Sequence, residues 1–199
     1  MKAITSTLLQ QYGASLNRFA KSEYIFHEDW PAHFYFQVEE GSVKMFNAGE
    51  NNDYVQSFFA HGESFGEPPL LGDFAYPADA RAVTECKIWV LKKANFLKLL
   101  EENYEAHLAL TQSLAKRLCY KTKLLNAMNT QNPEKRILTI IDFFKNKTPR
   151  TNSPYEVPFT RQALADMTGL RVETVIKKVI QLAETGELKL TNHKILRSW

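Results

Sequence analysis

A long segment without helix breakers, in the middle of the chain, most limits how the protein can fold. Residues 94–128, ANFLKLLEENYEAHLALTQSLAKRLCYKTKLLNAM, contain neither Gly nor Pro. Apolar or small residues recur there at alternating steps of three and four: Leu97, Leu100, Tyr104, Leu108, Thr111, Ala115, Leu118, Thr122 and Leu125. This spacing predicts one amphipathic helix of about 50 Å with a heptad-like seam. The seam favours pairing of two copies of the chain, and packing within one chain is the alternative.

The residues before this helix have the composition of short strands. From about Ser22 to Leu91, runs rich in Val, Phe, Tyr and Ile are separated by Gly, Asn and Pro. Residues 39–43 (EEGSV) and 47–52 (NAGENN) are typical of hairpin turns, in which Gly or Asn supplies a positive φ. We expect an antiparallel β-roll, with the first twenty residues as a helix packed outside it.

A second boundary follows the long helix. Pro133 cannot continue a helix but suits the first turn of a new one. We therefore predict an α+β chain with three parts: a β-roll at 1–93, a long helix and hinge at 94–131, and a C-terminal domain at 132–199. In the last part we expect a helix at 134–147, an extended piece at 155–159, two further helices, and a β pair that turns at Asn192 and His193.

Composition and charge narrow the class of protein. Hydrophobic residues make up 44% and charged residues 24%, values typical of soluble globular proteins. No apolar run approaches the ~18 residues that span a bilayer, and the N-terminus lacks a secretory pattern, so we expect a cytoplasmic protein without a membrane partner. Residues 1–93 contain 8 basic and 12 acidic side chains, whereas residues 131–199 contain 12 and 7. This asymmetry makes the C-terminal third the part suited to a polyanion.

The cysteines and histidines give no basis for metal or catalytic chemistry. Cys86 and Cys119 are both embedded in apolar sequence, which predicts two buried free thiols, with a single disulfide as the alternative. The five histidines are scattered without metal-ligand spacing. No arrangement of nucleophile, base and orienting residue is visible, so we expect no enzyme activity and no metal.

Residues 159–190, FTRQALADMTGLRVETVIKKVIQLAETGELKL, have the pattern of a helix-turn-helix. Thr160 can cap the first helix through its hydroxyl, and Gly169 permits the left-handed turn that joins two helices at a steep angle. Wound at about 100° per residue from Glu173, the second helix separates into two faces. One is apolar, with Val172, Val175, Ile176, Val179, Ile180, Leu182 and Ala183. The other is hydrophilic, with Glu173, Thr174, Lys177, Lys178 and Gln181.

The hydrophilic face is suited to reading DNA. Lys can donate to guanine or phosphate, Glu can accept from cytosine, and Thr can contact phosphate or a thymine methyl. A merely solvated face is the alternative. The preceding glycine turn, the following β pair and the local positive charge favour a recognition helix.

At these residues the sequence resembles the winged helix-turn-helix of the Crp/Fnr family. The matching elements are Thr160-Arg161-Gln162, Leu164-Ala165, Gly169, Glu173-Thr174-Val175, and Leu182 followed by Gly186 and Leu188. The resemblance extends over nearly the whole chain, since the family has a sensor β-roll of the cyclic-nucleotide-binding type (a double-stranded β-helix), a long dimer helix, a hinge and a winged helix. It implies a homodimeric transcriptional regulator that binds double-stranded DNA at an inverted repeat and has RNA polymerase as a further partner.

The resemblance also implies roles for single residues. Glu173 and Lys177 would read bases, and Arg161, Gln162 and Thr174 would contact phosphates. The remaining predicted DNA contacts are Thr160, Arg171 and Lys178. Two departures predict an operator unlike the family's best-known site: Val172 replaces the usual Arg, and Lys177 lacks the bidentate fork of an Arg.

Residues 62–82, GESFGEPPLLGDFAYPADARA, resemble the family's phosphate-binding cassette. In the cyclic-nucleotide binders the second Glu accepts a hydrogen bond from the ribose, and an Arg with a small hydroxyl residue holds the phosphate. Gly66 and Glu67 match, but Tyr76 and Pro77 stand where the Arg pair would fall. Arg81, about four residues late, could substitute for the missing cation. The effector-binding candidates are therefore Gly66, Glu67, Tyr76 and Arg81.

Neither the residues nor the resemblance identifies the effector. We expect a small effector other than cyclic AMP, or none, and no cofactor. A cyclic-AMP-dependent regulator is one alternative, and a nucleotide or protein-interaction module that does not bind DNA is another. An iron-sulfur cluster would need N-terminal cysteines, and none precedes Cys86. Haem bound through His27 or His33 is less favoured, because a lone His in a β-roll is more often a surface residue.

Overall fold

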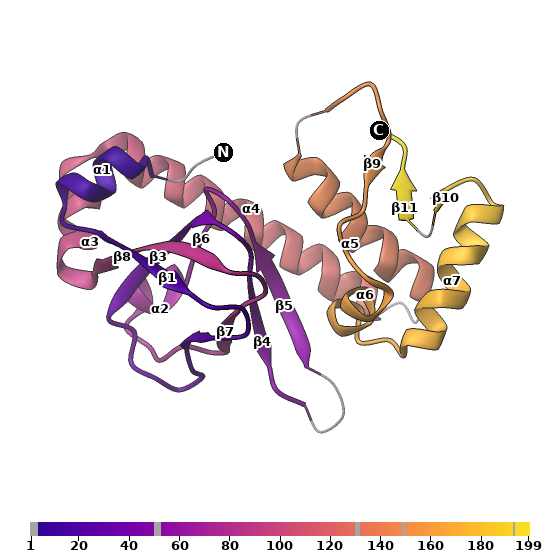
Figure 1. Ribbon diagram of the computed structural model, residues 1–199, viewed down its shortest axis with the longest axis horizontal. Helices are drawn as coiled ribbons and strands as arrows, with labels where there is room; N and C mark the ends of the chain where they lie inside the picture. Colours follow the sequence, from indigo (N-terminus) through magenta and orange to yellow (C-terminus); the bar gives the residue numbers. More distant parts are fainter. Residues whose placement is uncertain (1–3, 50–52, 130–131, 149, 193) are drawn as a thin grey trace. The chain divides into compact units, whose positions relative to one another are not determined.

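The computed structural model describes residues 4–49, 53–129, 132–148, 150–192 and 194–199. These residues form two compact units, Met1–Ala115 and Lys116–Trp199 (Figure 1). The predicted turn residues 50–52 and His193, and the predicted hinge residues 130–131, lie outside the described ranges. None of the described helices is long and apolar enough to cross a membrane.

The first unit is built on two four-stranded antiparallel sheets, which confirms the predicted roll. One sheet has the order β1-β8-β3-β6 and the other β2-β7-β4-β5. The strands are β1 (Ser15–Phe19), β2 (Tyr24–Phe26), β3 (Phe34–Glu40), β4 (Val43–Asn47), β5 (Tyr54–Phe59), β6 (Ser64–Phe65), β7 (Asp79–Ala82) and β8 (Cys86–Lys92). Between β3 and β4, Gly41 has a φ of +87°, and a Cβ there would collide with the Glu85 carbonyl.

Aromatic residues fill the space between the two sheets. Phe26 and Phe36 lie 5.5 Å apart, and Phe36 stacks on Phe65 at 5.3 Å between ring centroids. The buried amide of Gln37 donates to the Ile4 carbonyl at 2.9 Å. This bond ties the N-terminal segment to β3 and gives a buried polar group its partner.

The N-terminal helix is shorter than expected. The prediction of a helix for the first twenty residues is wrong, because α1 covers only Ser6–Gln11 and β1 then pairs with β8. Gly13, with a φ of +82°, follows the end of α1 and lets the chain turn back toward the sheet.

The long helix is divided into two. The structure has α3 (Lys93–Glu102) and α4 (Tyr104–Asn129) in place of one predicted helix. At the break, Asn103 has φ −130° and ψ 87°, and its side-chain amide donates to the Leu99 carbonyl at 2.9 Å. In an unbroken helix the backbone N–H of residue 103 would make that bond. The same amide also donates to the Tyr12 hydroxyl at 2.8 Å, so local side-chain bonding outcompetes the helix.

The second unit has three helices and a three-stranded sheet besides the end of α4, within the residues described. They are α5 (Pro133–Lys147), β9 (Tyr155–Glu156), α6 (Arg161–Thr168), α7 (Val172–Glu184), β10 (Lys189–Thr191) and β11 (Lys194–Arg197), with sheet order β10-β11-β9. Asn132 caps α5 by accepting from the Lys135 N–H at 3.0 Å. The predicted helices, extended piece and terminal β pair are thereby confirmed.

Both cysteines are free thiols, so the disulfide alternative is wrong. Cys86 is buried, as expected, but Cys119 is exposed on α4. Its neighbour Tyr120 takes the inward position and stacks on Phe143 at 3.5 Å. Adjacent positions on a helix face different directions, which an apolar sequence context does not reveal.

The break at Asn103 leads to a stability prediction. Asn103→Ala removes the donor to Leu99 and Tyr12, so we expect the free energy of unfolding to fall by about 1–2 kcal/mol. Urea denaturation of the full chain measures this change. Asn17→Ala, on exposed β1, is the matched control and should stay within about 0.5 kcal/mol of the wild type. Equal effects of the two substitutions would contradict the role given to Asn103.

Candidate nucleic-acid interface

Helix α6 is stabilised by a side-chain N-cap and by the burial of one of its faces. The Thr160 hydroxyl accepts from the Ala163 N–H at 3.0 Å, as the sequence predicts for an N-cap. Leu164, Ala165, Met167 and Thr168 are buried. Gly169 ends the helix with a φ of +66°, the left-handed conformation that the predicted turn requires.

Helix α7 presents a mixed face to solvent. Val175, Val179 and Leu182 are buried, and the helix packs against α5 and α6. The exposed residues are Glu173, Ile176, Lys177, Ile180 and Glu184. The prediction that Ile176 and Ile180 face the core is therefore wrong, since their side chains are 45% and 47% exposed.

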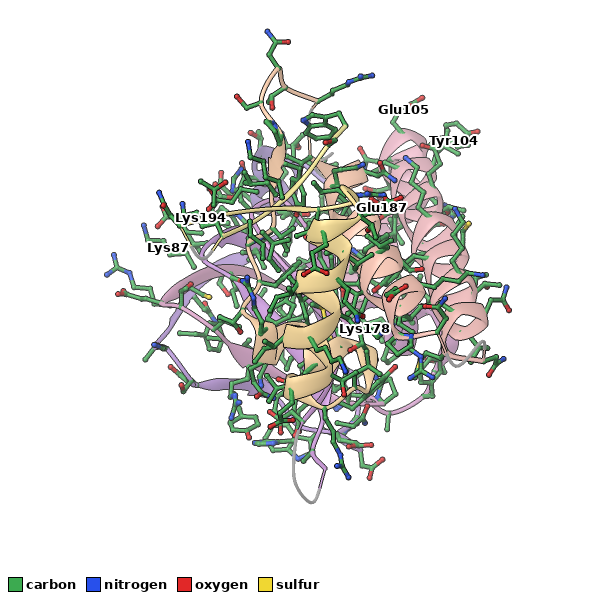
Figure 2. All side chains as sticks on the ribbon, turned by 90° about the vertical axis from the view of Figure 1, so that its right-hand side faces the viewer. Lys87, Tyr104, Glu105, Lys178, Glu187 and Lys194 are labelled. Carbon is green, nitrogen blue, oxygen red and sulfur yellow. The ribbon has the colours of Figure 1, made fainter. Side chains whose placement is uncertain are left out.

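The reason for this difference lies in α5. Lys178, which the sequence places on the hydrophilic arc, turns toward α5, where its Nζ lies 3.0 Å from Glu134 Oε1. Figure 2 labels Lys178 on α7. Thr174 and Gln181, on the same side, are half-buried. The solvent-exposed face of α7 is thus centred near Glu173. Part of the polar face predicted from the sequence lies toward α5 and is not fully exposed.

The other predicted DNA contacts lie at the start of the two helices. Gln162 is exposed, and its amide donates to Asp166 Oδ1 at 2.7 Å. Arg161 is half-buried, and this burial lowers the pKa of its guanidinium from the ordinary value. Arg171 is exposed and forms the N-cap position of α7. The structure therefore brings these residues to the N-terminal ends of α6 and α7, within one unit.

A β wing follows α7. The Leu188 N–H donates to the Leu182 carbonyl at 3.0 Å and links the helix to the wing. Arg197 anchors β11, with its Nε 3.0 Å from Asp142 Oδ1 and its Nη1 2.5 Å from Glu187 Oε2. The hydrogen bond to Asp142 is the main reason that the pKa of Arg197 is raised. Lys189 is exposed at the wing. Nothing in its sequence context, apart from the local positive charge, marks it as a candidate DNA contact.

The sensor cassette forms a turn into α2 (Glu67–Gly72). Gly66 has a φ of +74° at the N-cap of this helix, and Glu67 is fully buried. Tyr76, only 3% exposed, stacks on Phe26 at 3.8 Å, and its hydroxyl donates to the Phe34 carbonyl at 3.2 Å. Burial raises the pKa of Tyr76 to about 12. A Cβ on Gly66 would lie 3.2 Å from the Tyr76 ring, so an aromatic side chain fills the space beside the cassette.

Arg81 lies on the other face of its sheet. In β7, Ala80 and Ala82 are buried in the core, so Arg81 between them points outward. Its guanidinium lies 3.4 Å from Asp53 Oδ2 and over the Phe46 ring at 4.8 Å. The structure therefore brings together Gly66, Glu67 and Tyr76 but not Arg81.

A surface hollow of about 300 Å³ lies near the end of α2 and is lined in part by cassette residues. Its lining consists of Asp29, Pro31, Ala32, Pro69, Asp73, Phe74, Ala75 and Lys93. None of the four effector-binding candidates lines it. Among the residues that the structure describes, no cluster of His, Cys, Asp and Glu has the arrangement of a metal site.

Comparison with known proteins finds relatives whose matches extend over both units. Residues 16–103 match the cyclic nucleotide-binding domain. The nitrogen fixation regulation protein FixK from Azorhizobium caulinodans is 24% identical over 181 residues, which cover 88% of this chain and 72% of FixK. The cAMP-activated global transcriptional regulator CRP from Haemophilus influenzae is 24% identical over 177 residues, covering 87% and 79%.

The fold is shared with solved structures of the same type. A CooA mutant from Carboxydothermus hydrogenoformans superposes with a TM-score of 0.79 at 16% identity, over 97% of this chain and 86% of CooA. The chain thus contains a cyclic nucleotide-binding domain at residues 16–103, and it shares the fold of regulators of the Crp/Fnr type, with helix-turn-helix architecture in its C-terminal part.

Proposed function

We propose that the protein is a homodimeric, sequence-specific DNA-binding transcriptional regulator whose sensor pocket does not bind cyclic AMP. The observation that most supports DNA binding is the α6–Gly169–α7 arrangement, in which a capped helix, a left-handed turn and a second helix leave Glu173 and Lys177 exposed. The similarity of the chain to the regulators FixK and CRP supports the same function.

In this proposal the recognition helix is α7. Glu173 and Lys177 read bases in the major groove, while Thr160, Arg161, Gln162, Arg171 and Thr174 seat the domain on the phosphates. Lys178 contributes less, because Glu134 already neutralises much of its charge. The net positive charge of the C-terminal third, 12 basic against 7 acidic side chains at 131–199, attracts the polyanion.

The homodimer is supported by the exposed seam of α4. Tyr104, Leu118 and Leu125 are 72%, 70% and 59% exposed. Thr111, Ala115 and Thr122, at seam positions between Tyr104 and Leu125, are also exposed, and Leu108 is half-buried. Figure 2 shows Tyr104 pointing away from the ribbon at one end of α4. A second copy of α4 covers such a seam and places two recognition helices on an inverted repeat, with half-sites ~34 Å apart.

The sensor is proposed to respond to an effector other than cyclic AMP, or to none. The cassette keeps Gly66 and Glu67, but Tyr76 fills the adjoining space. A buried phosphate without its cation forgoes a charged hydrogen bond of ~1.5–3 kcal/mol, which is roughly tenfold to a hundredfold in affinity. A cyclic-AMP-dependent regulator is the second candidate, since the cassette frame is retained and one relative is cAMP-activated CRP.

We further propose the three-part division made from the sequence: a sensor at 1–93, a dimer helix and hinge at 94–131, and a DNA-binding domain at 132–199. RNA polymerase is the proposed partner of the DNA-bound dimer. The relatives FixK and CRP are transcriptional regulators, which is consistent with a function that needs no catalytic residues.

DNA binding is tested by selecting duplexes from a random library and measuring gel shifts on the enriched sequence. We expect Glu173→Ala and Lys177→Ala each to weaken binding by about 1–3 kcal/mol and to relax the preference at one base. Lys178→Ala, the adjacent lysine, is the matched control and should lose much less. Wild-type binding by both Glu173→Ala and Lys177→Ala would refute base readout by α7.

Dimerisation is tested by adding charge to the seam. We expect Leu118→Asp with Leu125→Asp to convert the dimer into a monomer of 22.9 kDa, measured by sedimentation equilibrium. Two carboxylates on each helix would face their copies in the partner, and exposed leucines would no longer be covered. Lys123→Asp, on another side of α4, adds a carboxylate away from the seam and should leave the dimer intact. A wild-type protein that sediments as a monomer would rule out the proposal.

The effector proposal is tested by calorimetry. We expect no submicromolar binding of cyclic AMP or cyclic GMP to the full-length protein, since Tyr76 supplies no positive charge and Arg81 is paired with Asp53. Submicromolar binding that Arg81→Ala abolishes would favour the cyclic-AMP-dependent alternative.

A further inference from the structure

The exposed face of α7 includes two isoleucines. Ile176 and Ile180 are 45% and 47% exposed and lie one helical turn apart. At about 100° per residue, both lie within about 60° of Glu173 around the helix axis, and Lys177 lies about 40° from Glu173 on its other side. The apolar surface therefore lies inside the candidate DNA interface, next to the proposed base readers.

The chemistry of the major groove offers one apolar target. Its edges present hydrogen-bond donors and acceptors, and the C5-methyl group of thymine is the exception. Exposed helix positions are ordinarily polar, and a β-branched residue has a lower helix propensity than Ala, Lys or Glu. Two such residues on one exposed face fit a partner surface that contains methyl groups.

We propose that Ile176 and Ile180 contact the C5-methyl groups of thymines beside the bases read by Glu173 and Lys177. The inference rests on the proposed DNA-binding function and adds a determinant of its specificity. A methyl contact distinguishes thymine from cytosine without a hydrogen bond. The two isoleucines thus add apolar selection to the polar readout of their neighbours.

The test uses the full-length protein and the duplex enriched from a random library. Each thymine of a half-site is replaced in turn by deoxyuridine, which removes only the methyl group and keeps every hydrogen-bonding edge. We expect affinity to fall about fourfold at each contacted thymine, the loss that corresponds to one buried methyl group. In Ile176→Ala and Ile180→Ala, the penalty should disappear at the thymine that each residue contacts.

A matched control separates this effect from a general loss of apolar surface. Leu16, in β1, is 42% exposed, and Leu16→Ala should keep the wild-type sensitivity to deoxyuridine. The inference is wrong if deoxyuridine leaves the affinity for the enriched sequence unchanged. It is also wrong if the loss of affinity caused by deoxyuridine persists in both isoleucine variants. Neither result contradicts DNA binding itself. If no sequence is enriched, both the inference and the proposed function fail.

Discussion

The burial of three aliphatic side chains fixes how α7 is turned. Val175, Val179 and Leu182 pack into the second unit, and each can stabilise it by about 1.5–3 kcal/mol. Their positions set the rotation of the helix about its own axis, because turning the helix would bring them into water. The packing of these core residues therefore determines which side chains of α7 are exposed to a partner. The distribution of polar residues along α7 does not determine it.

The same constraint acts on the β-roll. Because successive residues of a strand face opposite sides, the buried positions of Ala80 and Ala82 oblige Arg81 to point outward. A shift of one residue in β7 would reverse this arrangement and place a cation in an aromatic core. The cassette thus keeps its glycine turn and buried Glu67, while the side chains of Tyr76 and Phe26 fill the space beside it.

The sequence predicted those features that depend on local chemistry. The Thr160 cap, the left-handed Gly169 and the strands of the roll follow from residue type and spacing. The prediction from the sequence failed where a residue distant in the chain competes with the local pattern. The break at Asn103 depends on a hydroxyl 91 residues away, and the exposure of Ile176 depends on α5 occupying the neighbouring side of α7. Periodicity shows that a helix has two faces, but it places their borders only to within a residue or two.

The hydrogen bonds around Tyr12 have a consequence for the order of assembly. Its hydroxyl donates to Glu102 across 90 positions of the chain and accepts from Asn103 across 91. Contacts so distant in sequence require nearly the whole roll to close first, because the entropy of the intervening loop opposes them. We therefore expect the N-terminal limit of α4 to be defined late in folding. A chain with a complete roll has an α4 of fixed starting point, and an unfinished chain does not.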